Sequence, residues 1–210
     1  MLHPILHQSF AVIDQEIGTH PFNPAEYAIV RRVIHSTADF EFKNLVRFSP
    51  GAIAAGILAL QHRHVPIITD VSMVQQGIKN LVAQTFGTRI ISAVEQVEVP
   101  LPGKTRTETG LLQCIQEFPN AIVVIGNAPT ALLALCQHLQ TATVQPALVI
   151  GAPVGFIAVV ESKAALAPLA VPQIRVEGRK GGSTVAAAIV NALITLAWEQ
   201  ESFQNNLSSL

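Results

Sequence analysis

The feature that most constrains this chain is the regular return of short apolar runs, rich in β-branched residues, each followed by a segment that favours a helix. Val65–Asp70, Ala121–Ile125 and Ala147–Ile150 are the clearest runs. Apolar runs without polar alternation are typical of strands buried on both faces. Weaker strands are expected at Arg89–Ser92 and Gln173–Val176. Strands that alternate with helices predict an α/β fold, with a mostly parallel sheet flanked by helices.

Local signals predict where helices begin and end. Asn23 and Pro24 form a cap followed by proline, which predicts a helix from Pro24 to Ile34. The segment Ala52–His62 is apolar nearly all round, so we expect a buried helix. We expect residues 1–199 to form one domain. It starts irregularly over residues 1–23, where Phe10–Ile13 is a candidate for a short helix or strand. Residues 200–210 are expected to be a polar, fraying tail. Further helices are expected over Val71–Asn80, over Thr107–Glu117, from the Gly126–Thr130 break to Leu139, from Glu161 onward, and over Ser183–Glu199.

Charge and cysteine content exclude several classes of function. The net charge is −1, so no strong field attracts nucleic acid or an anionic membrane. Cys114 and Cys136 lack metal-ligand spacing and are too few for a secreted disulfide scaffold, so we interpret both as buried small residues. The chain shows no signal segment, and the apolar run Ala186–Trp198 is interrupted by Asn191 and Thr195. We therefore expect a soluble, cytoplasmic protein.

The segment Arg31–Phe40 concentrates polar chemistry in a chain with only 13% charged residues. Its His35 is a candidate acid or base, because imidazole titrates near neutral pH. Asp39 or Ser36 is expected to orient the ring. A structural or solvated histidine is the alternative. A Ser-His-Asp triad using Ser9 or Ser36 is conceivable, but the chain lacks the Gly-x-Ser-x-Gly elbow that would support a hydrolase.

The residues after the predicted strands point to one binding edge. Ligands of parallel α/β sheets bind outside the carboxyl ends of the strands. We therefore expect Asp70, Asn127, Pro153 and Arg179 to converge there, with His35 brought in from the N-terminal helix. The glycines of these breaks allow a ligand to approach backbone N–H groups. Ordinary strand-to-helix turns are the alternative.

Two basic loops are candidate anion sites. Gly178–Thr184 places two cations among three glycines directly before a helix, and Ser183 can cap that helix. Lys104 and Arg106 lie in a turn-rich loop, and arginine suits bidentate recognition of carboxylates. A solvated loop is the alternative in each case. A nucleotide-dependent enzyme is a further alternative, although the dinucleotide and Walker spacings are absent.

Taken together, several motifs resemble one known family. Arg31–Phe40 resembles the signature of precorrin-8X methylmutases, a family of cobalamin biosynthesis that also has a cobalt-precorrin-8 branch. The resemblance spans roughly residues 5–198. It continues in order through Thr69–Ile78, Thr105–Thr107, Ile125–Leu132, Gly151–Phe156, Glu161–Lys163 and Gly178–Ser183.

The resemblance implies a homodimeric α/β isomerase without a cofactor or a metal site of its own. Such an enzyme moves a methyl group from C-11 to C-12 of precorrin-8X, giving hydrogenobyrinate, or of cobalt-precorrin-8, giving cobyrinate. It implies that His35 donates a proton or a hydrogen bond to the macrocycle, and that Ser9 and Arg106 contact the substrate. The other expected substrate-binding residues are Arg31, Arg32, Asp39, Asp70, Met73, Gly77, Asn127, Pro153, Gly155, Ser162, Lys163, Arg179, Lys180 and Gly181.

The chemistry of the residues agrees with a tetrapyrrole-derived substrate. A broad apolar ring requires an aliphatic cavity, and its rim of carboxylates requires arginines and helix N-termini. A corrinoid-binding or carrier protein without turnover is the alternative of another class. Whether the substrate carries cobalt stays open. The helices Ala52–Leu60 and Val185–Ala197 are candidates for the dimer interface.

Overall fold

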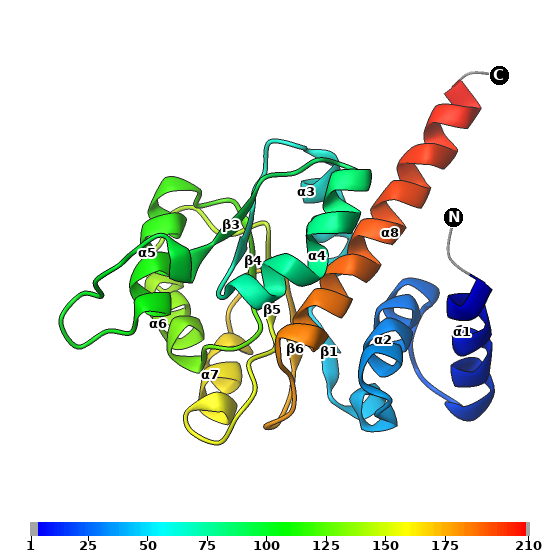
Figure 1. Cartoon of the computed structure of the whole chain (residues 1–210), viewed down its shortest axis with the longest axis horizontal. Coiled ribbons are helices and arrows are strands. Elements are labelled where there is room, and N and C mark those ends of the chain that lie inside the picture. Colours follow the sequence, from blue (N-terminus) through cyan, green and yellow to red (C-terminus); the bar gives the residue numbers. More distant parts are fainter. Residues whose placement is uncertain (1–3, 209–210) are drawn as a thin grey trace.

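A computed structural model describes the backbone of residues 4–208 and the side chains of residues 4–205. It contains one sheet, formed by β1 (Val46–Phe48), β2 (Ile67–Thr69), β3 (Ile90–Ser92), β4 (Ile122–Ile125), β5 (Leu148–Gly151) and β6 (Gln173–Val176). The strand order is β1-β6-β5-β4-β2-β3, and only β1 runs antiparallel to its neighbour (Figure 1). This confirms the predicted single-domain α/β fold with a mostly parallel sheet.

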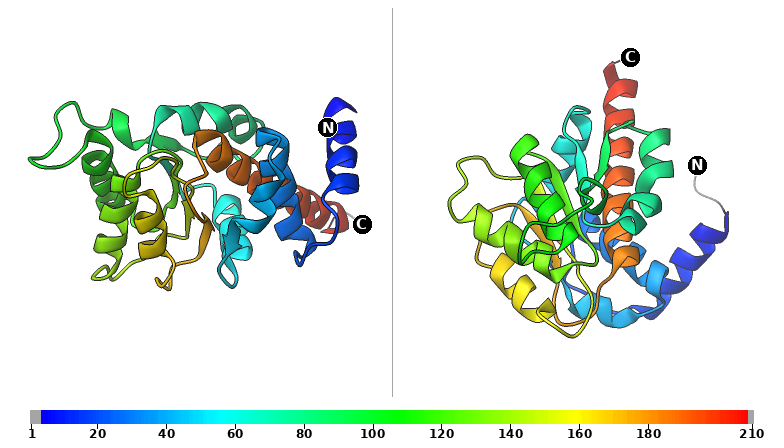
Figure 2. Two further views of the ribbon diagram at one scale, coloured as in Figure 1. Left: turned by 90° about the horizontal axis from the view of Figure 1, so that it is seen from below. Right: turned by 60° about the vertical axis from the view of Figure 1, so that its left-hand side comes forward.

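Helices cover both faces of this sheet. On one face lie α5, α6 and α7, and on the other lie α3, α4 and α8, with α2 packed on α8 and α1 packed on α2 (Figures 1 and 2). The helices are α1 (Pro4–Glu16), α2 (Pro24–Thr37), α3 (Ala52–Gln61), α4 (Ser72–Gln84), α5 (Arg106–Glu117), α6 (Pro129–Leu139), α7 (Val159–Leu166) and α8 (Ser183–Ser208), with two 3₁₀ turns, η1 (Phe40–Asn44) and η2 (Ala93–Glu95).

The central strands are buried on both faces, as their unbroken apolar runs predict. In β4, Ile122 and Val124 face the core under α8, whereas Val123 and Ile125 face the core under α5 and α6. All four side chains are at most 2% exposed. Successive strand residues point to opposite faces, so two apolar cores require apolar residues at every position.

The N-terminal prediction is wrong in extent: residues 4–16 form helix α1, whereas only Phe10–Ile13 was a candidate for a short helix or strand in an irregular segment. Phe10 and Ile13 are its buried residues. With Leu6 and Ile17 they recur every three or four residues, which is a helical spacing. In the described chain, α2 is the principal contact of α1. The helix therefore forms an outer layer that packs mainly on α2, away from the sheet (Figure 2).

Two further boundaries differ from the predictions. Strand β1 was not expected, because it is three residues long and has Arg47 at its centre. As an edge strand it pairs only with β6, so a charged side chain is tolerated. Residues 200–208 continue α8 instead of fraying. This end of the helix extends past the body of the domain (Figure 1), and its polar residues suit a solvated helix.

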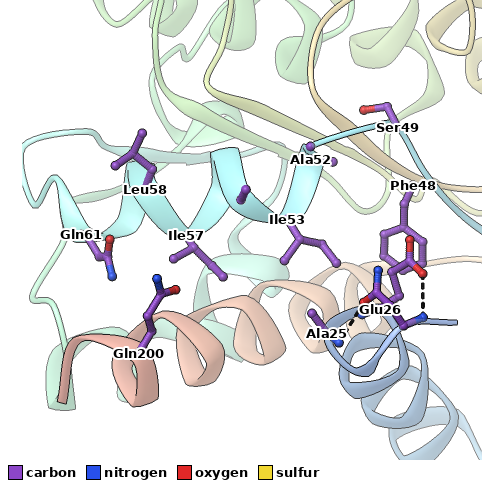
Figure 3. A pocket seen from close by; sticks show the side chains of 13 residues that line it. Ala25, Glu26, Phe48, Ser49, Ala52, Ile53, Ile57, Leu58, Gln61 and Gln200 are labelled. Carbon is purple, nitrogen blue, oxygen red and sulfur yellow. Dashed lines mark hydrogen bonds between the residues drawn. The ribbon is translucent and has the colours of Figure 1, made fainter. Parts of the chain in front are cut away.

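Helix α3 is only half buried, contrary to the expectation of full burial. Ala52, Gly56, Ala59 and Leu60 face the core, whereas Leu58 is 56% exposed. The outer face of α3 borders a groove of about 590 Å³, together with the start of α2 and Gln200 of α8 (Figure 3).

Candidate active site

An open pocket of about 500 Å³ lies between α1, α2, α4 and α8. Helices α4 and α8 begin shortly after β2 and β6 end, so the pocket lies at the edge of the sheet where α/β folds bind ligands. Its volume is in the range of small-molecule sites. Its walls are Leu6 of α1, Arg32, His35 and Ser36 of α2, Met73 and Gly77 of α4, and Ser183, Thr184, Ala187, Ala188 and Asn191 of α8.

His35 enters this pocket from the last turn of α2. The helix begins at the predicted cap, where the Asn23 side chain accepts hydrogen bonds from the N–H groups of Ala25 and Glu26. It ends at Ala38, whose φ of 53° is left-handed. Because α2 continues three residues beyond the predicted end at Ile34, His35 is held on a helix and not in a turn.

Neither Ser36 nor Asp39, the two residues expected to orient His35, is hydrogen-bonded to its ring. Ser36 Oγ donates to the carbonyl of Val33 at 2.9 Å. The Asp39 carboxylate accepts from the N–H of Glu41 and from Lys180 Nζ at 2.5 Å, and these hydrogen bonds hold its pKa below the ordinary value. Among residues 4–205, no side chain or backbone group is hydrogen-bonded to the exposed His35 imidazole.

The two adjacent arginines have different environments. Arg31 Nη1 forms an ion pair with Asp14 Oδ2 at 3.0 Å, and its guanidinium lies over the Phe10 ring. Arg32 lines the pocket, and within the described chain it has neither an ion pair nor a hydrogen bond. Burial lowers the pKa of Arg32 from its ordinary value. A partly desolvated guanidinium without an anionic partner is ready to bind a carboxylate.

The face of α8 in the pocket was not recognised in the sequence. Thr184, Ala187, Ala188 and Asn191 are spaced as one helical face. The signal was available, because Asn191 interrupts an otherwise apolar run. Its Nδ2 donates to the carbonyl of Gly77 at 2.9 Å and joins α8 to α4.

Gly77 allows α4 and α8 to form the floor of the pocket. A Cβ added to Gly77 would lie 2.8 Å from the Ala187 Cβ, so a side chain there would push the helices apart. Met73, one turn earlier on α4, is 69% exposed beside the pocket. Both residues, which the sequence predicts to contact the substrate, line this pocket.

Asp70 supports the strand-end loops and does not reach the pocket. Its carboxylate is fully buried and accepts the N–H groups of Val71, Gly126, Asn127 and Ala128 at 2.6–3.0 Å. Burial raises the pKa of this carboxyl, and the N–H donors oppose that shift. The structure therefore gives Asp70 a structural role in place of the expected substrate contact.

Ser162 and Lys163 are likewise internal. Ser162 Oγ donates to the carbonyl of Val159 and is fully buried. Lys163 is 3% exposed and donates from Nζ to the carbonyls of Gly178 and Lys180 at 2.8 and 2.7 Å. Burial lowers the pKa of Lys163 to about 8. Ser162 thus bonds only within α7, whereas Lys163 joins α7 to the loop before α8.

The loops after β5 and β6 contact each other, but none of Asp70, Asn127, Pro153 and Arg179 lines the His35 pocket, contrary to the expected convergence with His35. The N–H of Gly155 donates to the carbonyl of Arg179, and the N–H of Gly182 donates to the carbonyl of Ala152. A Cβ on Gly181, whose φ is 154°, would lie 2.4 Å from the Ala152 carbonyl oxygen, so only glycine fits. Lys180 crosses to η1, where Nζ also binds Glu41 at 2.6 Å. The loop is thereby fixed at the start of α8.

Several expected site residues lie outside the His35 pocket. Arg106, the first residue of α5, donates to the carbonyls of Val94 and Val97. Helix α5 lies at the far end of the molecule from α1 (Figure 1). Ser9 Oγ donates within α1 to the carbonyl of Ile5. The other three residues expected at the strand ends also lie outside the pocket. Asn127 is exposed, and Pro153 is buried. Arg179 is exposed, and its guanidinium lies over the Phe156 ring.

The pocket supplies an exposed imidazole, an unpaired guanidinium and an apolar floor of small residues. Among the described residues, no group of three histidine, cysteine or carboxylate side chains could hold a metal ion. No helix of the described chain is long and apolar enough to cross a membrane. The arrangement can hold an anionic, largely apolar molecule against a proton donor or acceptor.

Comparison with known proteins agrees with this chemistry. The family model described as precorrin-8X methylmutase matches residues 4–196. A cobalt-precorrin-8 methylmutase of Synechocystis sp. is 56% identical over 94% of this chain and 97% of the relative. A precorrin-8X methylmutase of Pseudomonas aeruginosa is 39% identical over 91% of this chain and 94% of the relative.

A solved structure has the same fold. The crystal structure of a precorrin-8x methyl mutase from Thermus thermophilus matches with a TM-score of 0.86 and 43% sequence identity. The match covers 94% of this chain and 99% of the other. Both the sequence and the arrangement of elements are therefore shared over nearly the whole chain.

Proposed function

The chain belongs to the precorrin-8X methylmutase family, and from this premise we propose that it catalyses the methyl shift of a precorrin-8 substrate in the pocket of His35. It is an isomerase that moves a methyl group within one macrocycle. The observation that carries the assignment of the site is that His35 and the unpaired Arg32 line the same open pocket of about 500 Å³.

The proposed reaction moves a methyl group from C-11 to C-12. The bond from the methyl carbon to C-11 breaks as the bond to C-12 forms, so no external methyl donor or oxidant is needed. His35 donates a proton or a hydrogen bond to the macrocycle and stabilises the charge that develops on the ring. General acid assistance of this kind is worth roughly 10²- to 10⁴-fold in rate. The small residues of α4 and α8 allow the flat ring to approach the helices.

Two features of the pocket suit the carboxylates on the rim of the ring. Arg32 offers a guanidinium without a competing protein carboxylate. The first helical hydrogen bond of α8 is the one from the N–H of Ala186 to Gly182, so the N–H groups of Ser183 and Thr184 have no partner within the helix. A helix N-terminus favours bound anions through these free groups and the helix dipole. Ser183 and Thr184 both line the pocket.

The cobalt-containing substrate is the better candidate of the two. The relative that is 56% identical is named a cobalt-precorrin-8 methylmutase, and the named precorrin-8X methylmutase of Pseudomonas is 39% identical. Nothing in the pocket needs to bind the metal, because cobalt arrives inside the macrocycle. The site would bind either form through the carboxylates on the rim of the macrocycle.

The test is a spectral turnover assay with the two substrates in parallel and no added cofactor. We expect the absorption spectrum of the product corrin to appear with at least one substrate, and faster with cobalt-precorrin-8. Tight binding of a corrinoid without conversion of either substrate would contradict the proposal and favour a carrier protein. Preferential turnover of the metal-free substrate would overturn only the assignment of cobalt.

We also propose that the enzyme is a cytoplasmic homodimer. Both cysteines are buried free thiols, which suits a reducing compartment. Of the two interface candidates, the helix segment Val185–Ala197 is largely internal, whereas α3 exposes Leu58 beside the groove of Figure 3. Light scattering on the purified protein is expected to give twice the chain mass of 22.4 kDa. A monomer at micromolar concentration would contradict the dimer and leave the reaction untouched.

A further inference from the structure

The orientation of the His35 ring has an unusual origin. A proton donor in an enzyme is normally held by a hydrogen bond to its second ring nitrogen. Among residues 4–205, none makes such a bond to His35. The aromatic contact of the imidazole is with Phe10 of α1, at 5.5 Å between ring centroids and 83° between ring planes. This edge-to-face geometry is a preferred one for aromatic pairs.

Phe10 is itself held in place. Its side chain is only 8% exposed, and the Arg31 guanidinium lies 4.3 Å from the centre of its ring. Arg31 is fixed in turn, since Nη1 contacts both carboxylate oxygens of Asp14 at 3.0 and 3.3 Å. The Tyr27 hydroxyl also donates to Asp14. Burial and this hydrogen bond raise the pKa of Tyr27 to about 12, so the hydroxyl remains a donor.

These contacts form one continuous stack from Asp14 through Arg31 and Phe10 to His35. They also account for most of the polar attachment of α1 to α2 in the described chain. Phe10 is not among the residues that line the His35 pocket. Its effect on a substrate in that pocket must therefore pass through the imidazole.

We propose that Phe10 is a positioning residue that sets the orientation of His35 toward the pocket, and that the Asp14–Arg31 pair holds the Phe10 ring in place. The proposal rests on the proposed function of His35 as a proton donor. It gives Arg31, expected from the sequence to bind substrate, a role in the geometry of the site.

The experiment compares Phe10→Leu with Ile13→Val. Both changes shorten a buried apolar side chain of α1, but Ile13 lies a turn farther along the helix than Phe10. We expect Phe10→Leu to lower kcat about 10- to 100-fold, because a small misplacement of a catalytic group has such an effect. KM should change little, since the pocket wall is intact. Ile13→Val should retain wild-type kcat.

A direct readout of the ring separates this role from a loss of stability. The ring ¹⁵N and ¹H signals of His35 are assigned by their disappearance in His35→Asn. We expect Phe10→Leu to shift them and Ile13→Val to leave them in place. Asp14→Asn, a change at a partly exposed residue, should shift the same signals in the same direction. If Phe10→Leu does not fold, Asp14→Asn alone tests the proposal.

Unchanged His35 signals and unchanged kcat in both Phe10→Leu and Asp14→Asn would overturn the proposal. A fall in kcat equal to that of Ile13→Val would do so as well. Failure of the proposed function gives a different result. His35→Asn would then retain full turnover, whereas the His35 ring signals would still shift in Phe10→Leu.

Discussion

Asp70→Asn tests the claim that a single buried carboxylate organises the binding edge of the sheet. Oδ1 accepts the N–H groups of Val71 and Gly126, and Oδ2 accepts those of Asn127 and Ala128. An asparagine presents one oxygen and one NH₂ group, so one pair of N–H donors would face another donor. Two buried N–H groups would lose their partner.

The magnitude follows from these two bonds. A hydrogen bond to a charged group contributes about 1.5–3 kcal/mol, so two losses amount to about 3–6 kcal/mol. Removing a buried charge recovers part of its desolvation cost, and burial does raise the pKa of Asp70. We therefore expect the lower end, about 3 kcal/mol, which is a large part of a typical stability of about 5–15 kcal/mol.

Urea unfolding followed by the fluorescence of Trp198, the single tryptophan, measures this loss. Asp39→Asn is the matched control, because the Asp39 carboxylate also accepts a backbone N–H but forms its ion pair with Lys180 at the surface. Its effect should be much smaller, as for exposed ion pairs in general. A loss at Asp70 below about 0.5 kcal/mol, the range of surface substitutions, would refute the reasoning.

Two other changes separate residues that the sequence could not distinguish. Arg32→Met should raise KM roughly 10- to 100-fold in steady-state kinetics, the equivalent of one lost charge-assisted contact. Arg31→Met should raise KM less. Equal effects on KM would remove Arg32 from the carboxylate site. The pKa of Lys163 is lowered to about 8 from 10.5, so the unfolded chain binds more protons between these values and wild-type stability rises with pH there. Urea midpoints at both ends of this window should show that rise in wild type and lose it in Lys163→Met; an identical rise in the variant would contradict the linkage.

The sequence predicted those elements whose signal is local. Val123 and Val124 lie in an unbroken apolar run, and burial on both faces follows from that run alone. Strand β1 has no such run, because an edge strand tolerates a charged residue such as Arg47. Helix α1 did carry a signal in the spacing of Leu6, Phe10 and Ile13. Its polar exposed face hid that spacing from a reading based on apolar runs.

The site could be predicted only in part for a geometric reason. Neighbouring residues on a helix point about 100° apart, so Arg31 and Arg32 face different surroundings although they are adjacent in sequence. Which one faces the pocket depends on where α1 and α8 pack. Asp70 was expected at the substrate because it ends a predicted strand, and Lys163 because it lies in a motif of the resemblance. Their burial depends on backbone groups of distant loops, which no local pattern reveals.

The central claim is that the pocket between α1, α2, α4 and α8 is where the macrocycle reacts and that His35 is its proton donor. Single-turnover conversion of cobalt-precorrin-8 by His35→Asn, with binding measured by absorbance titration on the same sample, tests it most directly. The account predicts a dissociation constant close to that of wild type and a conversion rate lowered roughly 10²- to 10⁴-fold. Conversion at the wild-type rate would contradict it.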